Sequence, residues 1–130
     1  MSTFKADYII ARQEEIAGNT SSIPVKTVVN GTAKAWVNFN GTGTIAIRAN
    51  FNVASITDNG TGDYSINIAN ALSDANYCWT TNSSGESTYG SYGLYITPQA
   101  APTTTLLRLL TRSNAGTALD MIATNASINR

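Results

Sequence analysis

Short runs of alternating apolar and polar residues, each ended by an Asn-Gly corner, constrain this chain most. The tetrapeptide NGTG occurs twice, at residues 40–43 and 59–62. Before the first corner, Ala35, Val37 and Phe39 alternate with other residue types, and the same alternation follows the second corner. A period of two is typical of strands with one buried face. Asn and Gly tolerate the positive φ of tight hairpin turns, so both corners are predicted to join β-strands.

Further extended segments follow along the chain. We expect strands or extended chain over residues 44–49, 51–57, 64–68, 77–81, 92–97, 104–111 and 117–128, with a polar loop at 82–90. Polarity comes from 18 Thr, 14 Asn and 12 Ser rather than from charge, and this mix favours strands and turns over long helices. The sequence therefore predicts an all-β fold, an antiparallel β-sandwich or open barrel, formed by residues 24–130 as one domain.

Residues 1–23 differ from this body and are predicted to form an extended N-terminal arm ending in a Gly/Asn/Ser linker. Asp7 also suits the N-cap of a short helix that Gly18 would stop, so helical and extended conformations both stay open for residues 1–16. The apolar residues that we expect to anchor the arm to a partner are Phe4, Tyr8, Ile9 and Ile10.

The absence of histidine removes the commonest catalytic base and metal ligand. Eight basic and eight acidic residues cancel, and a neutral chain without a basic run is poorly suited to nucleic acid. The glycine pairs lack the third glycine and the helix of a dinucleotide loop. Residues 58–63 resemble a calcium loop but place glycines where oxygen ligands are needed. We therefore assign no catalytic, cofactor-binding or metal-binding residue and expect no enzyme activity. No apolar stretch reaches the roughly 20 residues that span a bilayer, so no membrane insertion is expected.

The residues also allow two functional alternatives to a purely structural chain: glycan hydrolysis and surface recognition. Paired carboxylates hydrolyse glycans, and the candidate acids are Asp58, Asp63, Asp74, Glu86 and Asp120, among which spacing selects no pair. Tyr89, Tyr92 and Tyr95 lie among glycines and form a candidate surface-recognition loop. The alternative for these tyrosines is core packing with the hydroxyl at the rim.

The sequence also predicts the environments of two single residues, Cys78 and Arg48. Cys78, the one cysteine, is expected to be a small buried apolar side chain. Arg48 is expected to be an edge or interface charge, and a buried pair with Asp63 is a further hypothesis.

The block of residues 34–78, KAWVNFNGTGT…SITDNGTGDY…DANY, resembles a module of virion structural proteins of tailed phages, commonly described as tail fibre proteins. The opening MSTFKADYI is similar to the short segment that often precedes this module, whereas the chain from Trp79 onward resembles nothing known to us. The resemblance implies a β-rich fold, a homotrimer, and a virion protein made in the host cytoplasm. Leu106, Leu107, Leu109 and Leu110 would then place one apolar side of a strand against another chain.

These expectations define three functions. The first is a non-enzymatic tail-fibre component that binds itself, other virion proteins and a host surface glycan. The second is a capsid decoration or cement protein, whose arm threads between capsid subunits. The third, and least favoured, is a tailspike-type glycan hydrolase.

Overall fold

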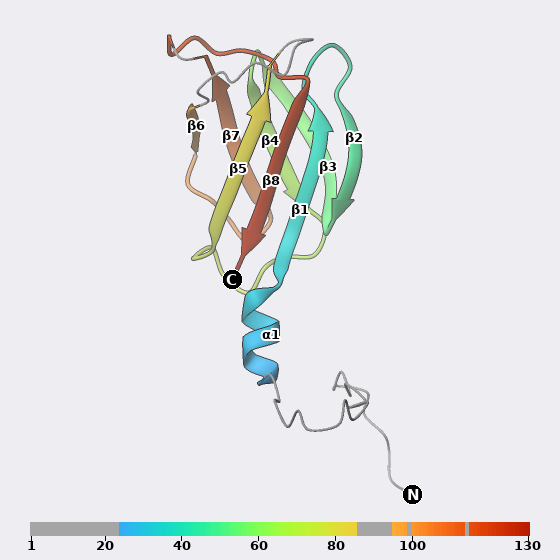
Figure 1. Cartoon of the computed structure of the whole chain (residues 1–130), viewed down its shortest axis with the longest axis vertical. Helices are drawn as coiled ribbons and strands as arrows, with labels where there is room; N and C mark the ends of the chain where they lie inside the picture. Colours follow the sequence, from blue (N-terminus) through green and yellow to red (C-terminus); the bar gives the residue numbers. More distant parts are fainter. Residues whose placement is uncertain (1–23, 86–94, 99, 114) are drawn as a thin grey trace, which may run out of the picture.

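The computed structural model describes residues 24–85, 95–98, 100–113 and 115–130. Within these ranges, eight strands form two antiparallel four-stranded sheets that pack face to face as a β-sandwich (Figure 1). Sheet A has the order β2-β1-β8-β5 and sheet B the order β3-β4-β7-β6. The strands are β1 (Ala33–Asn40), β2 (Ala46–Phe51), β3 (Val53–Gly60), β4 (Asp63–Ile68), β5 (Cys78–Ser84), β6 (Tyr95–Pro98), β7 (Leu106–Arg112) and β8 (Ala123–Asn129). The predicted all-β sandwich is confirmed.

Both NGTG corners are hairpin turns, as expected. The first joins β1 to β2 and the second joins β3 to β4. Gly43, Gly60 and Gly62 have positive φ, which explains why glycine stands there. In the first turn the Asn40 side-chain amide donates to the carbonyl of Thr42 at 2.7 Å. The turns are therefore specified locally, by residue types that the sequence displays.

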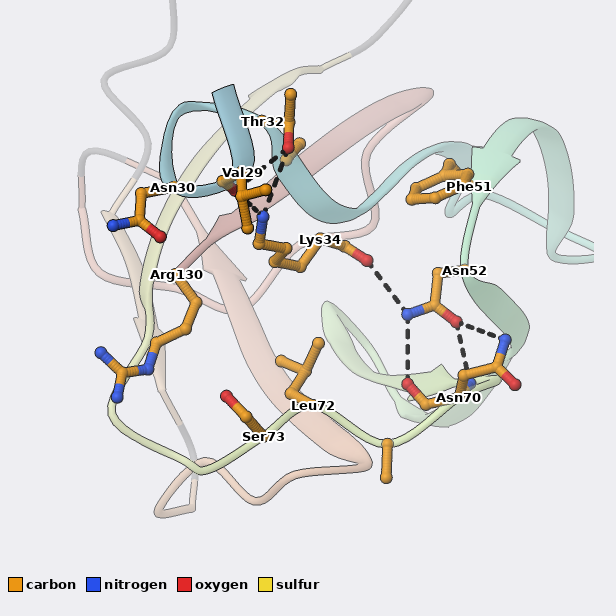
Figure 2. A pocket seen from close by; sticks show the side chains of 12 residues that line it. Val29, Asn30, Thr32, Lys34, Phe51, Asn52, Asn70, Leu72, Ser73 and Arg130 are labelled. Atoms are coloured by element: carbon orange, nitrogen blue, oxygen red, sulfur yellow. Dashed lines mark hydrogen bonds between the residues drawn. The ribbon is translucent and has the colours of Figure 1, made fainter. Parts of the chain in front are cut away.

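Asn52 turns the chain from sheet A into sheet B, and it is the one non-glycine residue with positive φ in the described ranges (φ 55°). Its amide nitrogen donates to the carbonyls of Lys34 (3.0 Å) and Asn70 (3.1 Å), and its Oδ1 accepts from the Asn70 backbone N–H (2.8 Å; Figure 2). Asn is one of the few residues that tolerate this conformation. The extension expected across residues 51–57 is therefore wrong at Asn52, where strands of two sheets meet.

The core lies between the sheets and is filled mainly by alternate residues of β1, β4, β7 and β8. Its most deeply buried members are Ala35, Val37, Phe39, Tyr64, Ile66, Leu107, Leu109 and Ile128. The rings of Phe39 and Tyr64 meet edge to face, with centroids 5.2 Å apart, a geometry that aromatic pairs prefer. The predicted inward faces of β1 and β4 are thus confirmed.

Strand β7 is apolar on both faces, as the sequence indicates. Leu107 and Leu109 belong to the core, Leu110 on the opposite face is 6% exposed, and Leu106 is half-buried. That this outer face meets another chain stays a prediction.

The boundaries of two other strands differ from the expectation. β5 continues through Ser84, so the predicted loop at 82–90 begins too early. β8 begins only at Ala123, because residues 119–121 instead pack across the turn ends.

Helix α1 (Val25–Gly31) precedes β1, where we expected no helix. It projects from the end of the sandwich at which β1 begins (Figure 1). None of its seven residues is buried, and its N-terminus has no side-chain cap. At its C-terminus, the Lys34 ammonium and the Thr32 hydroxyl both donate to the Val29 carbonyl (Figure 2). A cation at this position complements the helix dipole.

Candidate functional site

The two NGTG corners meet around one buried tyrosine. The Tyr64 hydroxyl lies 2.9 Å from both the Gly41 carbonyl and Asp120 Oδ1. The same Asp120 oxygen accepts the Gly62 backbone N–H at 2.6 Å. Burial, reinforced by the neighbouring Asp120 carboxylate, raises the pKa of Tyr64 far above its usual value. The hydroxyl is therefore a neutral hydrogen-bonding group that links turns from both sheets.

One glycine of each corner, Gly41 and Gly62, is packed closely against the protein around it. A Cβ on Gly41 would lie 2.5 Å from the Tyr64 hydroxyl oxygen, and one on Gly62 would lie 2.6 Å from the Thr111 carbonyl. Thr111 donates its backbone N–H to the Gly62 carbonyl at 2.8 Å and accepts the Leu119 N–H at 3.1 Å. The inner sides of both corners are thus occupied by the protein's own groups, which supports a structural role for NGTG.

The four candidate acids that the structure describes all accept hydrogen bonds from the chain. Asp63 accepts two from the Arg108 guanidinium, at 2.9 and 2.7 Å, and Asp74 pairs with Arg130. Asp58 accepts the Gly60 N–H at 2.9 Å, while Asp120 joins Tyr64 as described. Glu86 lies outside the described residues. Within those residues, no group of three or more His, Cys, Asp or Glu could hold a metal ion. The absence of catalytic, cofactor and metal residues stays a prediction.

The hypothesis that Arg48 pairs with Asp63 is wrong, because Arg108 on the neighbouring strand β7 holds that carboxylate. Arg48 instead lies exposed on the edge strand β2, as expected of an edge charge. Its guanidinium donates to the backbone carbonyls of Phe39 and Ile122. These bonds hold the edge strand β2 against β1 and against the segment that precedes β8.

The expectation that Cys78 is buried is also wrong: this residue is exposed at the start of β5. The next residue, Trp79, packs against the core, so alternation along the strand directs Cys78 to the opposite face.

The predicted recognition loop and anchor fall mainly outside the described residues. Tyr89 and Tyr92 lie there, as do Phe4, Tyr8, Ile9 and Ile10 of the arm. Tyr95 begins β6, where it pairs with Arg112 of β7. Their roles stay predictions.

A different surface was missed by sequence reasoning. Val25, Val28 and Val29 are 58%, 38% and 51% exposed on α1, and Phe51 at the end of β2 is 54% exposed. Val29 and Phe51 both line a hollow of about 740 Å³ between α1 and the sandwich (Figure 2). We name these four residues the α1 patch. The spacing of the valines, i, i+3 and i+4, is the signal that would have indicated one helix face.

Comparisons of the chain with known protein families, with curated proteins and with solved structures each find no match. In the part of the chain that the structure describes, no helix is both long and apolar enough to cross a membrane. The resemblance of residues 34–78 to a phage module therefore stays a prediction.

The glycine contacts predict a graded loss of stability. Gly62→Ala should lower the free energy of unfolding by more than about 3 kcal/mol, because both its φ of +69° and the nearby Thr111 carbonyl oppose a side chain. Gly41→Ala should cost about 2 kcal/mol through its clash with Tyr64. Gly43→Ala, with positive φ but open space around it, is the control and should cost about 1 kcal/mol. Urea unfolding measures all three, and equal losses would contradict the packing argument.

The pair formed by Asp63 and Arg108 predicts a pH dependence. Hydrogen bonds from Arg108 are the largest cause that lowers the pKa of Asp63 from its ordinary 3.8. A lowered folded-state pKa stabilises the protein fully above the ordinary value, and this contribution is lost as the pH falls through the lowered one. Arg108→Gln should therefore lower Tm at neutral pH and have a smaller effect at about pH 2.

Arg112→Gln is the matched control for this measurement. Arg112 lies on the same strand and donates to the Gly116 carbonyl, which does not titrate, so its effect on Tm should be the same at both pH values. An Arg108→Gln effect that is equally independent of pH would refute the role of the Asp63 charge.

Proposed function

We propose that the chain is a non-enzymatic structural protein of a bacteriophage virion, a short tail-fibre component that assembles as a homotrimer. The resemblance of residues 34–78 to a phage virion module supports the class of protein. The α1 patch is the observation that carries the self-association. A rigid sandwich whose described candidate acids are all engaged by their own chain suits a protein that acts by shape.

The argument for self-association starts from the length of α1. A helix of seven residues is far below the roughly 12–15 residues at which isolated helices become even marginally stable in water. Three of its residues are valine, a weaker helix former than alanine or leucine. Among the described residues, nothing buries a residue of α1 and no side chain caps its N-terminus. Contacts beyond those of the described residues are therefore needed to hold it.

A sister copy meets this need most simply. Val25 and Val28 have the spacing of a and d positions in a heptad, and isoleucine at both positions favours three or four helices over two. Valine shares that β-branching. Only Thr32 separates α1 from β1, so helices gathered around one axis would also bring their sandwiches together. A closed ring covers the same patch in every copy.

A capsid decoration protein is the second candidate, because the same fold, trimer and N-terminal arm would serve it equally. In both cases the partners are virion proteins, reached through residues 1–23. A glycan hydrolase is the least favoured, since it would need two carboxylates facing one substrate. The described acids instead bond to arginines, a tyrosine and backbone groups.

The trimer predicts a concentration-dependent mass. Sedimentation of the full chain at micromolar concentration should give three times the mass of one chain, 13.7 kDa. Val28→Asn should weaken the trimer at least tenfold, because it places a polar group in the apolar contact. Thr27→Asn, on the neighbouring position of the same helix, is the control and should leave the trimer intact. A monodisperse monomer of the unaltered chain would contradict the proposal.

Placement on the particle tests the virion role. Antibody labelling of the phage that encodes the chain should mark the tail, and deletion of residues 2–20 should abolish incorporation while the isolated β-domain keeps its strand circular dichroism. Label on the head would favour the decoration protein. A particle that lacks the protein would refute the virion role. A particle that still incorporates the deletion variant would refute the role of residues 1–23 as the anchor.

A further inference from the structure

We infer that the outer face of sheet A carries a binding site for a neutral oligosaccharide, built around Trp36 and a row of three asparagines. This inference deepens the proposed function, on which its biological role rests, because a tail-fibre component is expected to bind a host surface glycan. The site itself is argued from the described residues of sheet A.

The site is a shallow groove of about 350 Å³ across three neighbouring strands. Its lining comes from β1, β8 and β5, and the polar and aromatic residues among it include Trp36, Asn38, Thr80, Asn82, Asn125 and Ser127. The strand register arranges these side chains in two adjacent rows: Trp36, Ser127 and Thr80 form one, and the asparagines form the other. The volume lies at the lower end of the roughly 300–1,000 Å³ typical of ligand pockets, which suits one or two sugar rings.

The asparagines form a directional relay of hydrogen bonds. The Asn38 amide nitrogen donates to Asn125 Oδ1, and the Asn125 amide nitrogen donates to Asn82 Oδ1 at 2.7 Å. Arg48 Nη1 lies 3.5 Å from Asn38 Oδ1 at the start of the row. Bonds in such a chain polarise one another in the same direction. The relay ends at the exposed Asn82, which lines the groove and whose amide nitrogen donates to no group within the described residues.

The asparagines on the outer face of sheet B provide a comparison, because we propose no ligand site there. On its outer face, the Asn67 amide nitrogen donates to both Ser55 Oγ (3.0 Å) and Thr57 Oγ1 (2.9 Å). The Asn59 amide nitrogen likewise reaches Ser65 Oγ at 2.9 Å and Asp63 Oδ1 at 3.4 Å. These amides are satisfied by their own sheet. The open donor end is thus a property of sheet A rather than of an Asn-rich chain.

Trp36 supplies the apolar element of the groove. Its side chain is 39% exposed, because Ala35 and Val37 take the core positions on either side of it in β1. A sugar ring has hydroxyl groups at its edge and C–H groups on its faces. An aromatic ring beside oriented amides and hydroxyls offers complementary groups to both, as ligand sites commonly do.

The charge of the groove selects the class of ligand. None of the residues that line it is charged, and the nearby Arg48 already donates to two backbone carbonyls. Nucleic acids and acidic glycans would require free cations. Amides and hydroxyls, which together donate and accept, instead match neutral hydroxyl groups.

A printed array of neutral, sialylated and sulfated glycans, probed with the full chain, tests the inference. We expect neutral glycans to bind, and titration with the strongest of them to change tryptophan fluorescence. Trp36→Ala should weaken this binding at least tenfold, and Asn82→Ala several-fold. Asn67→Ala is the matched control, since Asn67 lies on the outer face of sheet B and does not line the groove, and it should leave the affinity unchanged. The bound glycan should be recovered intact.

Three results would overturn the site: no binding to any neutral glycan, binding that Trp36→Ala and Asn82→Ala leave unchanged, or quenching experiments in which acrylamide reaches Trp36 only after the trimer is diluted apart. The last would show that a sister copy covers the groove. Val28→Asn separates this inference from the proposed function, because the variant should lose the trimer and still bind the glycan.

Discussion

The contact of the Tyr64 hydroxyl with Asp120 and the Gly41 carbonyl is the interaction on which the rest of the structure depends. Gly41 belongs to a hairpin of sheet A, while Tyr64 and Gly62 belong to a hairpin of sheet B. Asp120 accepts hydrogen bonds from Gly62 and Tyr64, and the Tyr64 hydroxyl also contacts the Gly41 carbonyl. Elsewhere the sheets meet mainly through apolar side chains, which pack without fixing direction. A buried polar cluster has a single satisfied arrangement, so it sets how one sheet lies on the other. Asn52 performs the corresponding task at the α1 end, where its side chain bonds the carbonyls of Lys34 and Asn70.

Once the sheets are fixed in this way, the two surfaces that we propose for function lie side by side at sheet A. The α1 patch gathers Val25, Val28, Val29 and Phe51 at the end of the sandwich where β1 begins. Trp36 pairs with Phe51 but opens onto the groove of sheet A instead. With only 12% charged residues, the chain distinguishes its faces by amides, hydroxyls and a few exposed apolar side chains.

The sequence predicted what local physics determines. Alternation placed Ala35, Val37 and Phe39 in the core, and the Asn-Gly corners gave both hairpins. It could not show which distant residues become neighbours. Asn38 and Asn125 are 87 positions apart, and Asn125 and Asn82 are 43 apart, so the relay exists only through the order of strands in sheet A. The Asp63 partner was misjudged for the same reason, because Arg108 reaches it through the pairing of β4 with β7.

Other differences from the prediction have local causes. Asn52 interrupts the extended run predicted over residues 51–57, because Asn tolerates the left-handed conformation of a corner. No element was predicted over residues 25–31, where α1 forms, and valine is a weak helix former. The spacing of Val25, Val28 and Val29 places them on one helix face, and nothing among the described residues buries that face. The helix is therefore an argument for the partner that we propose.

Hydrogen–deuterium exchange of the α1 amides at several protein concentrations tests this central claim most directly. If sister copies hold the helix, the amides of Val28 and Val29 should be protected at high concentration and should exchange at nearly the rate of an unfolded peptide after dilution, while those of β1 and β4 stay protected throughout. Protection of α1 that does not change with concentration would show a helix stable within one chain, and would contradict the account.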